Sequence, residues 1–265
     1  MVGIAPEGTE ELLDEAVRRL VERLRPERIY LFGSRARGDA LEESDYDLMV
    51  VVPEPEIATI ERVREGREVL SKLLSPLDLL IWPRDAFERQ LPVIASLPAT
   101  IAREGRLIYQ REASAAAATL GIAGGNGGSM DAEKERLRLT WDWIEKAEED
   151  LVAAETLLRH TTVLDSVAYH GQQAFEKALM AFLTWHDEPF RKTHELKELL
   201  RQCEQYHAAF AQLRADAKVL GPYVAKFRYP GLGPNATATQ ATAAVQMARD
   251  TLVFVKAKLP ATPAP

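Results

Sequence analysis

The stretch that decides the fold of this chain is GSRARGDALEESDYDL, residues 33–48. The β-branched and aromatic run before it, residues 28–32, predicts a short buried strand that ends at Gly33. Residues 46–52, YDLMVVV, predict a second strand. A glycine between strands lets the backbone approach a ligand closely, and the serine after it offers a hydroxyl and an N–H to a phosphate oxygen. The stretch therefore predicts a nucleotide site between two strands.

Two carboxylates lie near the end of this stretch, at Asp45 and Asp47. Side chains two positions apart on an extended chain point to the same side. Two carboxylates placed there repel each other unless a cation lies between them. Mg²⁺ takes oxygen ligands from one or two carboxylates and completes its shell with water and substrate phosphates. The spacing therefore predicts a magnesium site at the start of the second strand.

The full pattern is more specific than its parts, because glycine-serine turns and Asp-x-Asp pairs are each common at turns and strand edges. Residues 33–34 (GS), Gly38 and residues 44–48 (SDYDL) together resemble the signature of the DNA polymerase β-type nucleotidyltransferases in their minimal form. In that family a third carboxylate comes from a later strand, and the apolar run SPLDLLIW at residues 75–82 supplies Asp78. The resemblance implies an enzyme that transfers a nucleoside monophosphate.

The resemblance also implies roles for single residues. Asp45 and Asp47 are expected to bridge two Mg²⁺ ions, while Asp78 binds one of them and helps to deprotonate the attacking hydroxyl. The nucleotide, ATP or another nucleoside triphosphate, is expected to contact four further residues: Gly33, Ser34, Arg37 and Ser44.

The two arginines of the stretch admit two roles. Arg35 and Arg37 suit charge-assisted hydrogen bonds to a triphosphate. On a solvated turn in an acidic segment they would instead balance the charge of their neighbours. The sequence leaves this choice open.

The composition is that of a folded protein with two domains. The chain has 265 residues, 46% of them hydrophobic and 28% charged, and a formal net charge of -7 at pH 7. This charge argues against broad attraction to nucleic acid or to an anionic membrane. Cys203 is the single cysteine and cannot form an intrachain disulfide. No leader or long apolar span is recognised, so a cytoplasmic protein is expected.

The first domain is expected to span residues 1–112. Apolar stripes at helical spacing predict helices over residues 8–25 and 57–74, and residues 106–109 predict a last short strand. Strands with helices packed outside them indicate an α/β or α+β domain with a short mixed sheet.

The second half is expected to be helical throughout. Small residues and glycines over residues 113–129 predict a flexible linker. Apolar residues recur every three or four positions over residues 130–259, which predicts an all-α antiparallel helical bundle. The last predicted helix covers residues 236–259, after two helices between Pro189 and Pro234. Residues 260–265 are expected to form a disordered tail.

The predicted bundle carries both polar and large aromatic side chains. His170, Gln173 and Lys177 share one helix face. Four large side chains exceed the needs of a short four-helix core: Trp141, Phe175, Phe182 and Phe227. This surplus predicts a homodimer through the helical domain.

Motifs in this half resemble a HEPN domain over most of residues 130–258. They are AEEDLVAAE (147–155), YHGQQAFEKAL (169–179), THEL (193–196) and RYP (228–230). HEPN domains accompany minimal nucleotidyltransferases as neighbours or fusions, often as toxin and antitoxin pairs. The two resemblances therefore support each other.

Many HEPN domains are metal-independent ribonucleases in which an arginine is followed, four to six residues later, by a histidine. Such a pair supplies acid-base chemistry and charge stabilisation at a phosphate. Arg201 and His207 satisfy this spacing, but the tyrosine found two residues after the histidine in some toxins is replaced by Ala209. The resemblance therefore favours no RNA cleavage.

One main hypothesis follows. It is a metal-dependent nucleotidyltransferase that moves a nucleoside monophosphate, foremost AMP, to a hydroxyl acceptor such as a protein tyrosine in a toxin-antitoxin-like system. The alternatives are an antibiotic-type enzyme with a small-molecule acceptor, a nucleotide-binding assembly module without catalysis, and a HEPN ribonuclease. The presence of all three aspartates counts against the module without catalysis.

Overall fold

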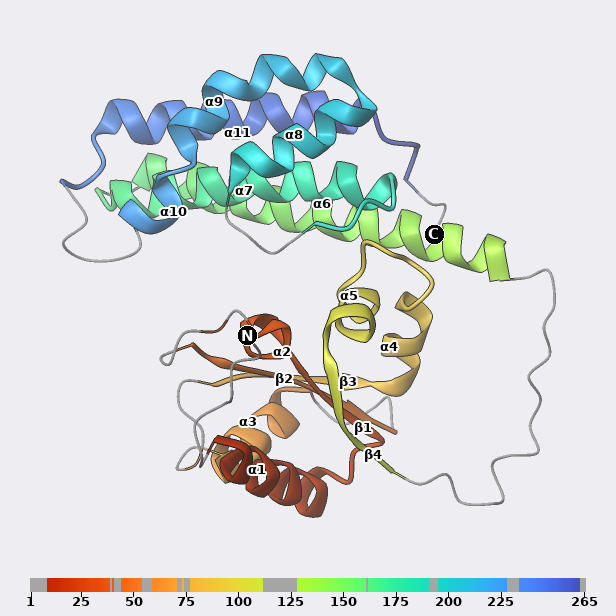
Figure 1. Ribbon diagram of the computed structural model, residues 1–265. Helices are drawn as coiled ribbons and strands as arrows, with labels where there is room; N and C mark the ends of the chain where they lie inside the picture. The colour runs from red at the N-terminus through yellow and green to blue at the C-terminus, as the bar shows by residue number, and fades with distance from the viewer. Residues whose placement is uncertain are drawn as a thin grey trace. The chain divides into compact units, whose positions relative to one another are not determined.

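A mixed sheet of four strands is the frame of the first half of the chain (Figure 1). The strands are β1 (Arg28–Phe32), β2 (Tyr46–Val52), β3 (Leu77–Pro83) and β4 (Arg106–Gln110). Their order is β3-β2-β1-β4, with β1 antiparallel to both neighbours and β2 parallel to β3. The continuous apolar run of β2 is explained by its place inside the sheet, where nearly every side chain is buried.

The chain divides into two units: an α/β unit of residues 1–92 and 96–132, and a helical unit of residues 133–265 with 93–95. The computed structural model describes residues 9–38, 40, 44–53, 59–70, 73, 77–111, 128–160, 162–190, 195–227 and 234–262. Of residues 9, 10, 59, 60, 128 and 129 it describes the backbone alone. Two predicted motifs fall outside the described residues: the first two residues of THEL (193 and 194) and all of RYP (228–230).

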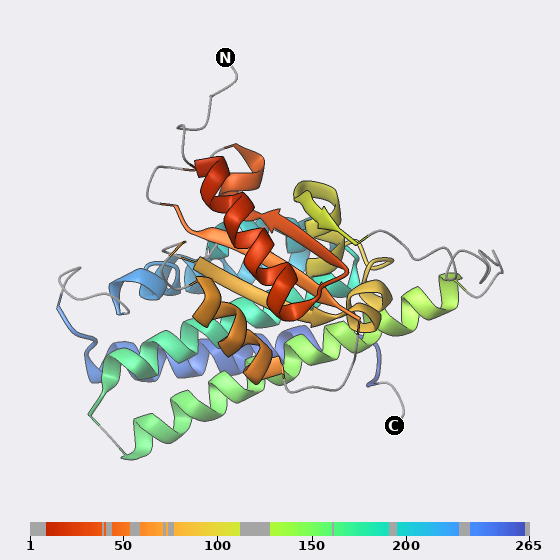
Figure 2. The same cartoon turned by 90° about the horizontal axis from the view of Figure 1, so that it is seen from below.

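Helices cover both faces of the sheet. They are α1 (Thr9–Leu24), α2 (Gly33–Arg37), α3 (Thr59–Leu70), α4 (Arg84–Gln90) and α5 (Leu97–Glu104). One face packs Ile29 and Val50 against Leu20 of α1, and α3 lies beside α1 on this face (Figure 2). On the other face Met49 packs with Phe87 of α4 and Ile101 of α5.

The local patterns predicted the strands better than the helices. β1 and β2 have the predicted bounds, and α3 lies within the predicted helix over residues 57–74. Helices α4 and α5 were not predicted, because 7 and 8 residues are too few for a clear apolar period. The start of α5 did carry a signal: Ser96 caps the helix by accepting a hydrogen bond from the N–H of Ala99, and Pro98 lies in the first turn.

The helical unit contains two long helices early in its sequence and one at its end. Its helices are α6 (Gly128–His160), α7 (Leu164–Trp185), α8 (Leu196–Tyr206), the 3₁₀ helix η1 (Ala208–Leu213), α9 (Arg214–Leu220), α10 (Tyr223–Lys226) and α11 (Ala238–Lys256). Ion pairs join Glu148 to Lys256 and Glu155 to Arg249, so α6 and α11 run antiparallel. Helix α6 begins inside the predicted linker, whose residues 113–127 lie outside the described part.

Helix α7 is the centre of this unit. Its packing against α11 is close, since a Cβ added at Gly171 would lie 3.0 Å from the backbone carbonyl of Ala244. Phe175 and Phe182 are fully buried in the core that α7 forms with its neighbours. The prediction that these two aromatics exceed the needs of the core is therefore wrong.

Two further predictions about the helical unit are corrected. The segment between Pro189 and Pro234 holds the short helices α8 to α10, with η1 among them, instead of two helices. The last helix begins at Ala238, after a capping box of Thr237 and Gln240, and ends at Lys256. Within the described residues, no helix combines the length and apolar character needed to cross a bilayer.

Candidate functional site

Gly33 and Asp47 meet where β1 ends beside the start of β2. Phe32, the last residue of β1, is the register partner of Asp47, so Gly33 leaves the strand next to this carboxylate. Gly33 has φ +72°, and a Cβ added there would overlap Asp47 Oδ2 and lie 2.8 Å from Asp47 Cγ. Only glycine both adopts this left-handed conformation readily and leaves room for the carboxylate. The backbone at position 33 is therefore a cradle for the side chain of Asp47.

Asp78 joins Asp47 through the parallel pairing of β2 and β3. The two aspartates are direct register partners, so their side chains project from the same face of the sheet. Asp47 is half-buried and Asp78 is exposed. Asp45 is also exposed and lies one residue before β2. Between Asp45 and Asp47, the ring of Tyr46 is buried on the other face of the sheet, in the core with α1 and α3. The structure thus brings Asp47 and Asp78 together, and Asp45 precedes Asp47 by two residues in the chain.

The predicted nucleotide contacts lie in α2 and just before β2. The carbonyl of Ser34 accepts a hydrogen bond of 3.0 Å from the N–H of Gly38, whose φ of +80° ends the helix. Arg37 is exposed at the end of α2. The carbonyl of Ser44 accepts a hydrogen bond from Arg35, so Arg35 connects α2 to the segment that carries Asp45.

The residues present fit a divalent metal ion by their chemistry. Carboxylate oxygens are the ligands that Mg²⁺ prefers, and Asp47 is held in a cradle that a larger residue at position 33 would fill. In the part of the chain that the structure describes, no group of three or more His, Cys, Asp or Glu side chains is placed to hold a metal ion. The three predicted ligands therefore remain a prediction as a set.

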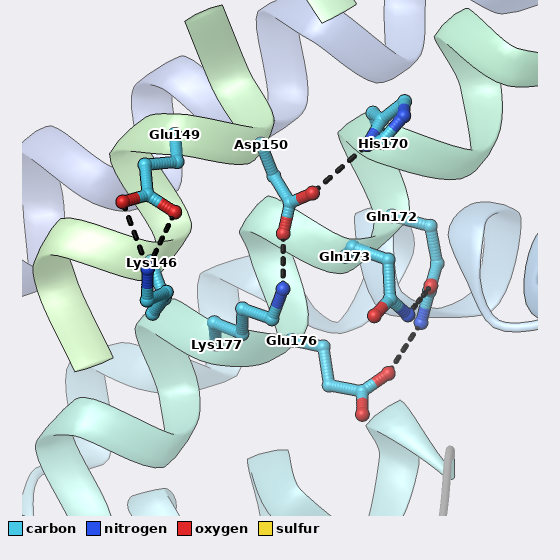
Figure 3. A network of polar contacts seen from close by, with 8 residues as sticks. All are labelled: Lys146, Glu149, Asp150, His170, Gln172, Gln173, Glu176 and Lys177. Carbon is cyan, nitrogen blue, oxygen red and sulfur yellow. Dashed lines mark hydrogen bonds and ion pairs between the residues drawn. The ribbon is translucent and has the colours of Figure 1, made fainter. Parts of the chain in front are cut away.

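A polar cluster in the helical unit joins α6 to α7 (Figure 3). One carboxylate oxygen of Asp150 lies 2.8 Å from His170 Nδ1, and the other accepts a hydrogen bond from Lys177. The side chain of Asp150 is 13% exposed, that of Lys177 25% and that of His170 32%. The helix face shared by His170 and Lys177 was visible in the sequence, but their common partner on another helix was not.

This cluster lies at the one open stripe of α7. Between Val167 and Leu183 every side chain of the helix is buried except four: Tyr169, His170, Gln173 and Lys177. Gln173, in the stripe, donates to the buried Gln172, and Gln172 donates to the buried carboxylate of Glu176. These two bonds lie within α7 and satisfy its buried polar groups, whereas the contacts of Asp150 with His170 and Lys177 connect α7 to α6.

Arg201 and His207, the predicted ribonuclease pair, bond to different neighbours. The guanidinium of Arg201 donates two hydrogen bonds, of 2.9 and 2.6 Å, to Glu198, and these bonds lower the pKa of that carboxyl. Nδ1 of His207 accepts a hydrogen bond of 3.3 Å from the N–H of Ala209. Both side chains are exposed at the surface of α8 and its end. In these contacts, Arg201 and His207 are not partners of each other, as a catalytic pair would be.

Comparisons with known proteins agree with the two resemblances. Residues 13–108 match the family model of a nucleotidyltransferase domain, and residues 140–258 match that of the HEPN domain. A solved structure, the crystal structure of TT1696 from Thermus thermophilus, is similar at 28% identity with a TM-score of 0.42. The similarity covers 45% of this chain and 98% of that one. No curated protein matches the chain.

Proposed function

Since this chain joins a nucleotidyltransferase domain to a HEPN domain, we propose that it is a metal-dependent enzyme that transfers a nucleoside monophosphate to a hydroxyl acceptor. The donor is ATP or another nucleoside triphosphate, with AMP as the transferred group. The observation that carries this proposal is the placement of Asp47 against Gly33 and opposite Asp78. It puts one acidic side chain against the glycine that follows β1 and a second opposite the first on β3.

Five residues of the site have a defined task in this reaction. Asp45, Asp47 and Asp78 would hold two Mg²⁺ ions, which, when bound, stabilise charge on the attacking and leaving oxygens. Ser34 and Arg37 bind the phosphates with a hydroxyl, an N–H and a guanidinium. Asp78 accepts the proton of the acceptor hydroxyl, whose oxygen forms a bond to the α-phosphorus. The bond to the β-phosphate oxygen breaks, and pyrophosphate leaves.

The acceptor that the domain pairing favours is a protein hydroxyl, such as a tyrosine, in a toxin-antitoxin-like system. Fusion of the two domains keeps the helical unit at high effective concentration near the transferase site. The acceptor then lies in the same chain or in a second copy. A small-molecule acceptor, as in antibiotic-modifying enzymes, is the competing outcome of the same assay.

The enzyme assembles as a homodimer through the helical unit. Val152 on α6 and Val253 on α11 support this proposal, because the two residues are 61% and 67% exposed on helices that two ion pairs hold together. Sedimentation of the full chain at micromolar concentration should give twice the monomer mass. A substitution of Val152→Lys should shift it to the monomer, and a monomeric wild type would contradict the proposal.

The transfer reaction is tested with purified full-length protein, ATP labelled at the α-phosphate, and Mg²⁺. We expect label to become attached to the chain itself, and Asp47→Asn to remove most of it because one metal-holding charge is lost. Asp14→Asn, an exposed aspartate on α1, is the matched control and should retain full transfer. Full labelling by Asp47→Asn would refute the assignment of the site, whereas labelling only of added small alcohols would move the acceptor outside the protein.

A further inference from the structure

Arg35 contacts both residues that flank Asp45. Its Nε donates a hydrogen bond of 2.8 Å to the carbonyl of Ser44. Its guanidinium carbon lies 4.1 Å from the ring centroid of Tyr46. One side chain of α2 thus holds the backbone before Asp45 and the side chain after it.

The ring of Tyr46 gives this contact a fixed base. Tyr46 is 8% exposed and belongs to the core beneath α1 and α3. A guanidinium stacked on a buried ring is attracted by the face of the ring and has little freedom to move. The carbonyl of Ser44 is therefore tied, through Arg35, to the core of the α/β unit.

Asp45 needs such a tie because the sheet does not hold it. The pairing of β2 with β3 begins at Tyr46, and its pairing with β1 ends at Asp47. Residues 44 and 45 lie outside both ladders, so no register fixes the carboxylate of Asp45 as it fixes Asp47 opposite Asp78. The contacts of Arg35 with Ser44 and Tyr46 hold the chain on both sides of Asp45, where the sheet does not.

We propose that Arg35 is a positioning residue that sets the carboxylate of Asp45 beside that of Asp47 for metal binding. This inference rests on the proposed function, in which both aspartates hold metal. The role that the sequence left open for Arg35, contact with the triphosphate, is disfavoured because its Nε and the face of its guanidinium are already used within the protein.

Arginine suits this task in a way that lysine does not. Its planar guanidinium donates in the plane through Nε while its face covers an aromatic ring, whereas the ammonium of lysine is a single point that cannot do both at these positions. Arg35→Lys keeps the positive charge and loses one of the two contacts. Arg35→Met keeps most of the side-chain length and loses both.

Binding of Mn²⁺ to the full chain, followed by electron paramagnetic resonance, tests the inference without any need for an acceptor. We expect Arg35→Lys and Arg35→Met to weaken Mn²⁺ binding by about tenfold or more, the usual effect of removing a group that orients a metal ligand. Amide hydrogen exchange at Asp45 and Tyr46 should become faster in both variants. Arg67→Lys, exposed on α3, is the matched control and should bind as the wild type does.

The binding of ATP in EDTA separates the two roles of Arg35. If Arg35 is a positioning residue, its substitution leaves the affinity for ATP in EDTA unchanged. If Arg35 binds the triphosphate, its substitution lowers that affinity. Weaker ATP binding with unchanged Mn²⁺ affinity and unchanged exchange at Asp45 would overturn the inference and leave the proposed function standing. Failure of the wild type to bind Mn²⁺ would instead overturn the proposed function, and the inference with it.

Discussion

The carboxylate of Asp47 occupies the space in which a side chain at Gly33 would lie. We expect Gly33→Ala to lose most transfer activity and Mn²⁺ binding, because its Cβ would displace Oδ2 of Asp47. The left-handed φ adds about 1 kcal/mol of destabilisation for a residue with a Cβ. The measurements are the transfer assay, Mn²⁺ titration and urea unfolding.

Gly38→Ala is the control for this prediction. Gly38 has φ +80°, but a Cβ added there would have no atom within 4 Å among those described. The control should therefore lose a similar amount of stability through backbone strain and keep its Mn²⁺ affinity. Equal losses of metal binding in both variants would show that strain, and not the displaced carboxylate, is responsible.

The polar cluster of Figure 3 supplies a second prediction, about stability. Asp150→Ala should lower the free energy of unfolding by about 1–3 kcal/mol, because it leaves Lys177 and His170 without their shared acceptor. The expected loss is below that of a deeply buried pair because both partners are partly exposed. Glu149→Ala is the control, since the pair of Glu149 with Lys146 is exposed and worth at most about 1 kcal/mol. Equal unfolding midpoints for the two variants would count against the cluster as a tie between α6 and α7.

The third prediction reverses a general rule for glycine in helices. Alanine in place of glycine inside a helix normally stabilises by roughly 0.5–1 kcal/mol. Gly171→Ala should instead destabilise by about 1–3 kcal/mol, because its Cβ would press on the backbone and side chain of Ala244 in α11. Urea unfolding of the full chain measures the change. A stabilised Gly171→Ala would contradict this prediction and show that α7 and α11 can move apart at little cost in free energy.

The fourth prediction concerns RNA. We expect no RNA cleavage that persists in EDTA, because Arg201 is held by Glu198 and His207 accepts a hydrogen bond from the backbone of its own turn. The assay is incubation of the full chain with labelled single-stranded RNA in EDTA. Cleavage that disappears in His207→Ala would contradict this expectation and make the helical unit a second active site.

The sequence by itself determined what depends on neighbours in the chain. The strands at residues 28–32 and 46–52 follow from short apolar runs bounded by turn residues, and both have the predicted bounds in the structure. Asp45 and Asp47 were singled out by type and spacing and Asp78 by the family resemblance, and their role as metal ligands stays a prediction. Both family resemblances are confirmed. Such signals are local, so they can be read without knowledge of packing.

Only the tertiary structure decided which distant residues meet. Asp47 and Asp78 are separated by 31 positions, and the parallel register of β2 and β3 makes them partners. The sequence also did not reveal that Arg35 contacts the protein itself, because this depends on where the carbonyl of Ser44 and the ring of Tyr46 lie after folding. Asp150 and Lys177 form an ion pair only when α6 packs on α7. Register and packing are fixed by burial of the whole apolar surface, and no short stretch of sequence contains that information.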